Sequence, residues 1–218
     1  GYIGLSKKFL NLINNKKIYL IEDVCESHGA KLGNKKAGTF GSISNFSFYY
    51  GHHMTTIEGG MISTNSKEID RLAKMKRGHG LLRDSQDNRF IKKIMNKNKD
   101  LNNDFIFSTE GFNFRNTELS AVIGIEQLKR LNNSIKIRNK NHKLYLKLLR
   151  DDIFFKNFNL KGLSNYGLHL ILKKPNSGLF KKVLHILNKN SVEYRLGSLG
   201  NQLRQPYLNR YKKNKYLK

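Results

Sequence analysis

The pattern of apolar and polar positions along the chain predicts a mixed α/β fold. Residues 6–17 place apolar side chains at near-helical spacing and predict a short amphipathic helix. The compact apolar run 18–21 predicts a buried parallel strand, and the alternating aromatic run 43–50 predicts another. Further strands are expected at 61–64, 168–172 and 192–195, and further helices at 65–77, 117–130, 135–150 and 177–188.

Two details of this pattern bear on the domain organisation. Asn65 is the expected cap of the helix that ends near Arg77, and residues 78–109 are polar and irregular, which indicates a surface excursion. After residue 152 the pattern changes to short alternations, which predicts a large domain over 1–150 and a small α+β domain over 151–218. Since the chain starts with Gly and its lysine-rich end has no closing element, we expect both domains to be partial.

Composition excludes several classes of protein. The chain has 218 residues, 38% of them hydrophobic, and contains no apolar run long enough to span a membrane. Neither a signal peptide nor a membrane partner is expected. Cys25 is the single cysteine, which excludes a disulfide scaffold, a multi-cysteine zinc site and a cysteine-ligated iron–sulfur cluster. A cytoplasmic location is therefore predicted.

The net charge of +25 raises the alternative of a nucleic-acid binder. However, lysines accompany asparagines throughout, as in residues 14–17 and 96–100, which indicates a compositional bias of the whole sequence. Because no nucleic-acid-binding motif is present, no specific nucleic-acid partner is expected. A basic nucleic-acid binder stays open as an alternative.

Three positions are candidates for chemistry. Asp23 ends a predicted strand, at the sheet edge where open α/β sheets bind ligands. Ser47 lies on the next strand, and the pair His52-His53 begins five residues later. Each has a structural alternative: Asp23 can cap a turn, Ser47 can be a solvated strand residue, and the histidines can be core residues or half a metal site. No metal is predicted, because neither an HExxH motif nor a third clustered ligand is present.

Five segments, in order, resemble one family of enzymes. They are IEDVCESHGA (21–30), GTFG (38–41), SFYYGHHMTTIEGG (47–60), GFNFRNTELSAVIGIEQL (111–128) and RLGSLGNQLRQP (195–206). Together they resemble the DegT/DnrJ/EryC1/StrS family, which is made up of fold-type-I pyridoxal-phosphate (PLP) enzymes acting on nucleotide sugars. The resemblance implies an α/β, aspartate aminotransferase-like fold, with a PLP-binding large domain and a homodimeric assembly.

Within this family the sequence is similar to the dehydratase branch. The family's cofactor lysine stands five residues after a phosphate-binding serine, and here His52 holds that place after Ser47. Imidazole cannot hold PLP covalently, but it transfers protons well near neutral pH. The resemblance implies C3 deoxygenation of a nucleotide-linked 4-keto-6-deoxyhexose, closest to GDP-4-keto-6-deoxymannose, for a dideoxysugar of a surface polysaccharide. Glutamate would be the amino donor, PLP and its pyridoxamine form the cofactor, and His52 the base.

The resemblance also assigns roles to other residues. Asp23 would partner the pyridinium nitrogen, Ser47 the cofactor phosphate, and Glu26 would lie near the O3′ of PLP. Asn113 would reach the cofactor phosphate of the partner subunit. Substrate or glutamate would be bound by arginines, whose guanidinium forks suit phosphate and carboxylate; the candidates are Arg83, Arg115 and Arg195. His53 is assigned only a supporting place beside His52.

Two alternatives remain within this resemblance. A sugar aminotransferase of the same family is disfavoured, because no lysine occurs between Lys36 and Lys67 to replace His52. A non-catalytic, truncated remnant is favoured by the lack of the family's phosphate-gripping Gly-Ser turn and ring-stacking residue before Asp23. The intact set of Asp23, Ser47 and His52 disfavours it.

Overall fold

The computed structural model describes residues 1–197 and 204–211. It divides the chain into two compact units, 1–170 and 171–218. Residues 151–170 belong to the first unit, and the division into domains at residue 150 stays a prediction. The central part of the 195–206 motif and most of the lysine-rich end lie outside the described residues.

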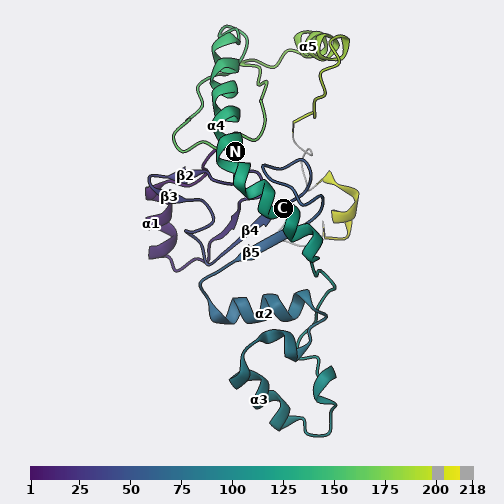
Figure 1. Cartoon of the computed structure of the whole chain (residues 1–218). Helices are drawn as coiled ribbons and strands as arrows, with labels where there is room; N and C mark the ends of the chain where they lie inside the picture. The colour runs from purple at the N-terminus through teal and green to yellow at the C-terminus, as the bar shows by residue number, and fades with distance from the viewer. Residues whose placement is uncertain (198–203, 212–218) are drawn as a thin grey trace. The chain divides into compact units, whose positions relative to one another are not determined.

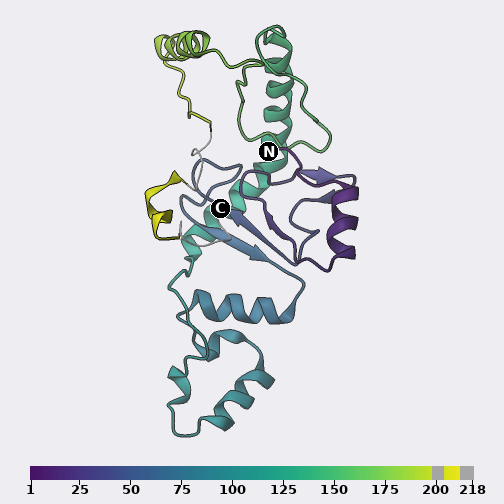
Figure 2. The same cartoon turned by 180° about the vertical axis from the view of Figure 1, so that it is seen from behind.

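A three-stranded sheet forms the centre of the first unit (Figures 1 and 2). Its strands are β1 (Ile21–Asp23), β4 (Ile43–Ser47) and β5 (Gly60–Ser63), in the order β1-β4-β5. β1 and β4 are parallel, and β5 is antiparallel to β4. The strands predicted at 43–50 and 61–64 are confirmed with shifted ends, and β4 ends at Ser47 because the chain then turns back toward β5. The strand predicted at 18–21 is parallel, as expected, but it lies at Ile21–Asp23, because Glu22 and Asp23 still pair with β4. Its expected burial is wrong: Ile18, Tyr19 and Ile21 are exposed, and Glu22 is the buried residue of β1.

The connection from β1 to β4 contains a small hairpin and contributes most of a hydrophobic cluster. Its strands β2 (Lys31–Leu32) and β3 (Lys35–Lys36) are antiparallel. The two-residue turn between them places Gly33 at φ +63°, a conformation that glycine adopts without strain. The cluster is formed by small and branched side chains from this connection, packed with residues from the N-terminus and β4: Val24, Ala30, Ala37, Ile3 and Phe46.

Helices flank the sheet in sequence. α1 (Lys7–Asn15) follows Ser6, whose hydroxyl accepts from the backbone N–H of Phe9, and confirms the first predicted helix. α2 (Lys67–Arg77) confirms the helix after β5, but the predicted cap is wrong by one residue. Ser66 caps α2, because its hydroxyl, and not the Asn65 side chain, accepts from Ile69 N–H at 3.3 Å.

The segment 78–109 is more regular than its polar composition predicts. It contains η1 (Leu82–Ser85), α3 (Asn88–Lys97) and η2 (Asn103–Phe105). α3 forms because Asp87 caps two backbone N–H groups at its start, those of Arg89 and Phe90. The prediction of an irregular excursion is therefore wrong for residues 88–97.

A single helix, α4 (Glu118–Leu148), replaces the two helices predicted over 117–130 and 135–150 (Figure 1). Thr117 caps it by accepting from Ser120 N–H at 3.3 Å. The asparagines at 132–133 do not interrupt it, because asparagine, unlike proline, keeps the backbone N–H that the helix hydrogen bonds need. Its second half is anchored by buried His142, whose ring nitrogen hydrogen-bonds the hydroxyl of Tyr2 at 2.8 Å.

After α4 the chain returns to the N-terminal part of the first unit. Gly162 accepts from Lys31 N–H at 2.9 Å, and Ser164 N–H donates to the Gly1 carbonyl at 3.1 Å. Gly162 has φ +69°, and a Cβ there would meet the Lys31 carbonyl, so this close approach needs glycine. Residues 162–166 are thereby held against segments more than 100 positions earlier.

The second unit contains α5 (Ser177–Lys189) and η4 (Pro206–Tyr211). α5 confirms the predicted helix, and Asn176 caps it through its bond from Leu179 N–H. The strands predicted at 168–172 and 192–195 are wrong: within the described part of the chain these residues form no strand. Alternation alone does not make a strand without a neighbour to accept its backbone hydrogen bonds.

Candidate functional site

Polar side chains gather where β1 and β4 end side by side. Asp23 lies opposite Asn45 in the parallel register, and the Asn45 amide donates to Asp23 Oδ1 at 3.1 Å. Ser47 follows two residues later, so it shares a face of β4 with Asn45. The predicted position of Asp23 at the carboxyl end of a strand is confirmed, at the edge where open α/β sheets bind ligands.

Asp23 is held as a carboxylate by the turn that follows it. The Cys25 thiol and the Cys25 backbone N–H both bond the Asp23 carboxylate and lower its pKa below the ordinary value. Burial, together with the same carboxylate, raises the pKa of the Cys25 thiol to about 11. Asp23 therefore caps a turn and also presents a negative charge at the strand edge.

The preceding residue, Glu22, anchors the loop beside this edge. Glu22 is buried, and its two carboxylate oxygens accept three backbone N–H groups at 2.6–2.7 Å, from Gly38, Phe40 and Gly41. The GTFG segment thus folds around one carboxylate. These bonds fix the start of β4 against the end of β1.

His52 lies in the turn that leaves β4. Its backbone N–H donates to the Tyr49 carbonyl at 3.0 Å, and its imidazole is half-buried. The Nδ1 atom is buried and has no hydrogen-bond partner among the residues that the structure describes. Two tyrosine rings meet the imidazole edge-on, with centroid distances of 5.8 Å from Tyr49 and 5.6 Å from Tyr166.

His53, in contrast, points into a buried polar cluster. Its Nε2 lies 3.0 Å from the Ser164 hydroxyl, which in turn donates to the His28 carbonyl. Because that hydroxyl proton is used, His53 Nε2 carries the proton it shares with Ser164. Burial lowers the pKa of both His28 and His53 to about 4, so both rings are neutral at physiological pH. His53 therefore has a supporting place beside His52.

The other predicted site residues of the first unit lie in two places. Glu26 is exposed, three residues after Asp23, and its carbonyl accepts from the N-terminal ammonium. Asn113 forms an isolated bridge with Gly78, and Arg115 Nη2 lies 3.8 Å from Asp84 Oδ2. Arg83 stands next to Asp84 with its guanidinium 5.7 Å from the centre of the Phe105 ring. The structure thus brings Arg83, Asn113 and Arg115 to the neighbourhood of Gly78 and Asp84.

Arg195 belongs to the second unit. It is exposed, and its Nη2 lies 3.4 Å from Glu193 Oε1. Residues 198–203 of the same motif lie outside the described residues.

Four neighbours of the site escaped the sequence analysis. Glu22 and Asn45 carried a detectable signal, since Glu22 precedes Asp23 and Asn45 is two residues before Ser47 on an alternating strand. Ser164 and Tyr166 carried none, because only the returning chain after α4 brings them to the histidines.

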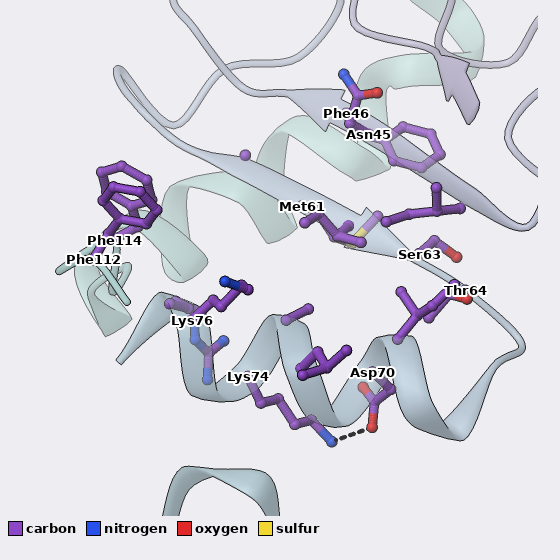
Figure 3. Close-up of a pocket in the computed structure, with 17 residues that line it drawn as sticks. Asn45, Phe46, Met61, Ser63, Thr64, Asp70, Lys74, Lys76, Phe112 and Phe114 are labelled. Atoms are coloured by element: carbon purple, nitrogen blue, oxygen red, sulfur yellow. Dashed lines mark hydrogen bonds and ion pairs between the residues drawn. The ribbon is translucent and has the colours of Figure 1, made fainter. Parts of the chain in front are cut away.

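A cavity of about 890 Å³ lies elsewhere, between β4–β5 and α2 (Figure 3). Phe46 and Met61 line it from the sheet, and the stacked rings of Phe112 and Phe114 stand at one end. Asn45 also lines it, but none of the predicted site residues does. The cavity is therefore not the polar edge that holds Asp23 and Ser47.

Two kinds of feature are absent from the described residues. No group of three or more His, Cys, Asp or Glu side chains there could hold a metal ion. Among the helices of that part of the chain, none combines the length and hydropathy needed to cross a membrane.

Comparisons with known proteins agree with the geometry. The chain is 35% identical over 201 residues to GDP-4-keto-6-deoxy-D-mannose 3-dehydratase of Escherichia coli O55:H7. This match covers 92% of this chain and 52% of that protein. A solved structure of the E. coli dehydratase with bound hydrated PLP matches with a TM-score of 0.77 at 34% identity, over 92% of this chain and 52% of that one. Another solved 3-dehydratase, with a trapped PLP–glutamate adduct, matches with a TM-score of 0.70 at 34% identity, over 85% of this chain and 48% of that one.

The model of the DegT/DnrJ/EryC1/StrS aminotransferase family matches residues 7–217, and the chain belongs to this family. The predicted resemblance is confirmed, as is the fold class: a mixed α/β, partial PLP-dependent transferase fold of type I. The chain spans about half the length of the relatives it matches.

Proposed function

We propose that this chain is part of a PLP-dependent nucleotide-sugar 3-dehydratase, which removes the C3 hydroxyl of a GDP-linked 4-keto-6-deoxymannose. One observation carries the proposal. His52 lies in the turn after β4, five residues beyond Ser47, where the family's aminotransferases have their cofactor lysine. A substitution of lysine by histidine removes covalent attachment of the cofactor and keeps proton transfer.

The residues at the strand edge fit PLP. Asp23 is ionised and hydrogen-bonded by Asn45, so its charge and orientation suit a protonated pyridine nitrogen. The Ser47 hydroxyl, on the same face of β4, suits the phosphate. Glu26 follows one turn after Asp23 and is assigned to the O3′ side. When bound, PLP supplies an electron sink for the bonds made and broken on the substrate.

His52 is the proposed base. Its imidazole is half-buried, its Nδ1 accepts or donates no hydrogen bond in the described part of the chain, and two tyrosine rings lie against it. Histidine is the side chain that enzymes use most often as a general base. His53 takes no part in this transfer, because its Nε2 proton is committed to Ser164.

The arginine group is proposed to bind the anionic parts of the substrates. Arg83 and Arg115 flank Asp84 on η1 and the adjoining loop, and Arg195 is assigned a similar role from its motif. Asn113 is exposed, as expected for a residue that reaches the cofactor phosphate of a partner subunit in a homodimer. The nucleotide sugar and glutamate are cytoplasmic metabolites, so we propose a cytoplasmic enzyme of surface-polysaccharide biosynthesis.

Atom balance makes the proposal testable. Removal of the C3 oxygen requires a two-electron reductant, and glutamate supplies it by becoming 2-oxoglutarate with release of ammonia. The 3-dehydratase reaction therefore yields one 2-oxoglutarate and one ammonia per sugar converted. An aminotransferase yields 2-oxoglutarate and no ammonia, because the nitrogen stays on the sugar. Assay of both products with PLP, glutamate and GDP-4-keto-6-deoxymannose tests the proposal: equal amounts support it, and 2-oxoglutarate alone contradicts it.

A further inference from the structure

We infer that Tyr166 is a positioning residue for His52, which it holds by ring contact. This inference rests on the proposed function in one respect, namely that His52 transfers a proton. The starting observation is that His52 Nδ1 is buried and, within residues 1–197 and 204–211, has no hydrogen-bond partner. A histidine that acts as a base is commonly oriented by a hydrogen bond to its second ring nitrogen. In the described part of the chain Nδ1 receives no such bond, and aromatic rings contact the imidazole instead.

The rings of Tyr49 and Tyr166 supply that contact. The planes of Tyr49 and Tyr166 meet the His52 plane at 70° and 61°, which is the T-shaped arrangement favoured by aromatic quadrupoles. Tyr49 lies in the same turn as His52 and moves with it. Tyr166 comes from a distant segment, so its ring holds the imidazole from outside the turn that contains His52.

Tyr166 is itself held by α4. Arg138 donates to the Tyr166 carbonyl at 3.1 Å, and Asn139 bonds both Leu163 O and Asn165 N–H, at 2.8 and 2.9 Å. Leu163, Ser164 and Asn165 are buried.

The same segment also grips the neighbour of His52. Ser164 bonds His53 Nε2 and the His28 carbonyl. His52 and His53 therefore both contact the segment 163–166. His53 is hydrogen-bonded to Ser164, and His52 packs against the Tyr166 ring. Since the contact with His52 is between rings, Tyr166→Phe is expected to keep it.

Three variants test the inference. Tyr166→Leu removes the ring, and Tyr166→Phe keeps it. Phe158→Leu is the matched control, because Phe158 is a half-buried aromatic of the same returning segment that stacks on Tyr2 at 5.3 Å and makes no ring contact with His52. The first readout is NMR of the histidine-labelled chain without cofactor, with the His52 signal assigned by its loss in His52→Asn.

We expect the His52 ring-proton resonances to shift in Tyr166→Leu and to stay in place in Tyr166→Phe and Phe158→Leu. In the sugar assay we expect kcat to fall roughly 10- to 100-fold in Tyr166→Leu with KM unchanged, as for a misplaced catalytic group, and to recover in Tyr166→Phe.

Unmoved His52 resonances in Tyr166→Leu overturn the inference, and so does a loss of kcat that Tyr166→Phe fails to recover. Failure of the proposed function appears differently, as active His52→Asn protein, while the NMR comparison still decides the contact.

Discussion

Replacement of Glu22 by glutamine tests whether one buried carboxylate organises the loop beside the site. Glu22 Oε1 accepts from Phe40 and Gly41, and Oε2 accepts from Gly38. In Glu22→Gln the amide oxygen can keep the first two bonds, while the amide NH₂ group faces the Gly38 N–H as a second donor. The change in shape is minimal, so the measured effect reports these bonds.

The magnitude follows from the three bonds. One buried N–H left without an acceptor costs about 1–3 kcal/mol, and the two remaining bonds lose the charge that made them strong, at roughly 1 kcal/mol each. We therefore expect Glu22→Gln to lower the free energy of unfolding by about 3–5 kcal/mol. Urea denaturation followed by circular dichroism measures it. Glu58→Gln, at an exposed position, is the control and should change stability by less than about 0.5 kcal/mol. An effect of Glu22→Gln as small as the control's would refute this account of the loop.

Two further predictions concern titration. The Cys25 thiol, with its pKa raised to about 11, should react slowly with iodoacetamide at pH 8.5. Asp23→Asn should accelerate the reaction, because the carboxylate no longer opposes formation of the thiolate. An unchanged rate would show that Asp23 does not act on the thiol. The pKa values of His28 and His53 are lowered to about 4 from 6.5, so the unfolded chain binds protons that the folded chain does not. Stability should therefore fall as pH decreases from about 6.5 to 4, and His53→Gln should make this fall shallower; a pH-independent stability over that range would contradict the burial of both rings.

Local patterns in the sequence were sufficient to predict which residues lie at the ends of β1 and β4. Asp23 follows a compact apolar run, and Ser47 and His52 are fixed by a five-residue offset that the turn after β4 preserves. Such features depend on neighbours in the chain. The shifted cap at Ser66 shows the limit even here, since Asn65 and Ser66 are both good caps and only the backbone geometry decides between them.

Contacts between distant segments could not be predicted. Ser164 and Tyr166 come to the histidines only because α4 is one continuous helix of 31 residues, from which Arg138 and Asn139 hold the returning chain. The pattern of apolar residues predicts two helices in place of α4, and it carries no signal for where the chain after α4 returns. Likewise, the hydrogen bonds from residues 38–41 to Glu22 depend on a turn that the sequence of these residues does not predict.

The central claim is that His52 serves in place of the cofactor lysine and directs the reaction to deoxygenation. Mass spectrometry of the sugar formed from GDP-4-keto-6-deoxymannose, with PLP and glutamate, tests it most directly. The account predicts a product that has lost one oxygen atom, and no such product with His52→Asn. A product in which an amino group has replaced the carbonyl oxygen, or a deoxygenated product that persists in His52→Asn, would contradict it.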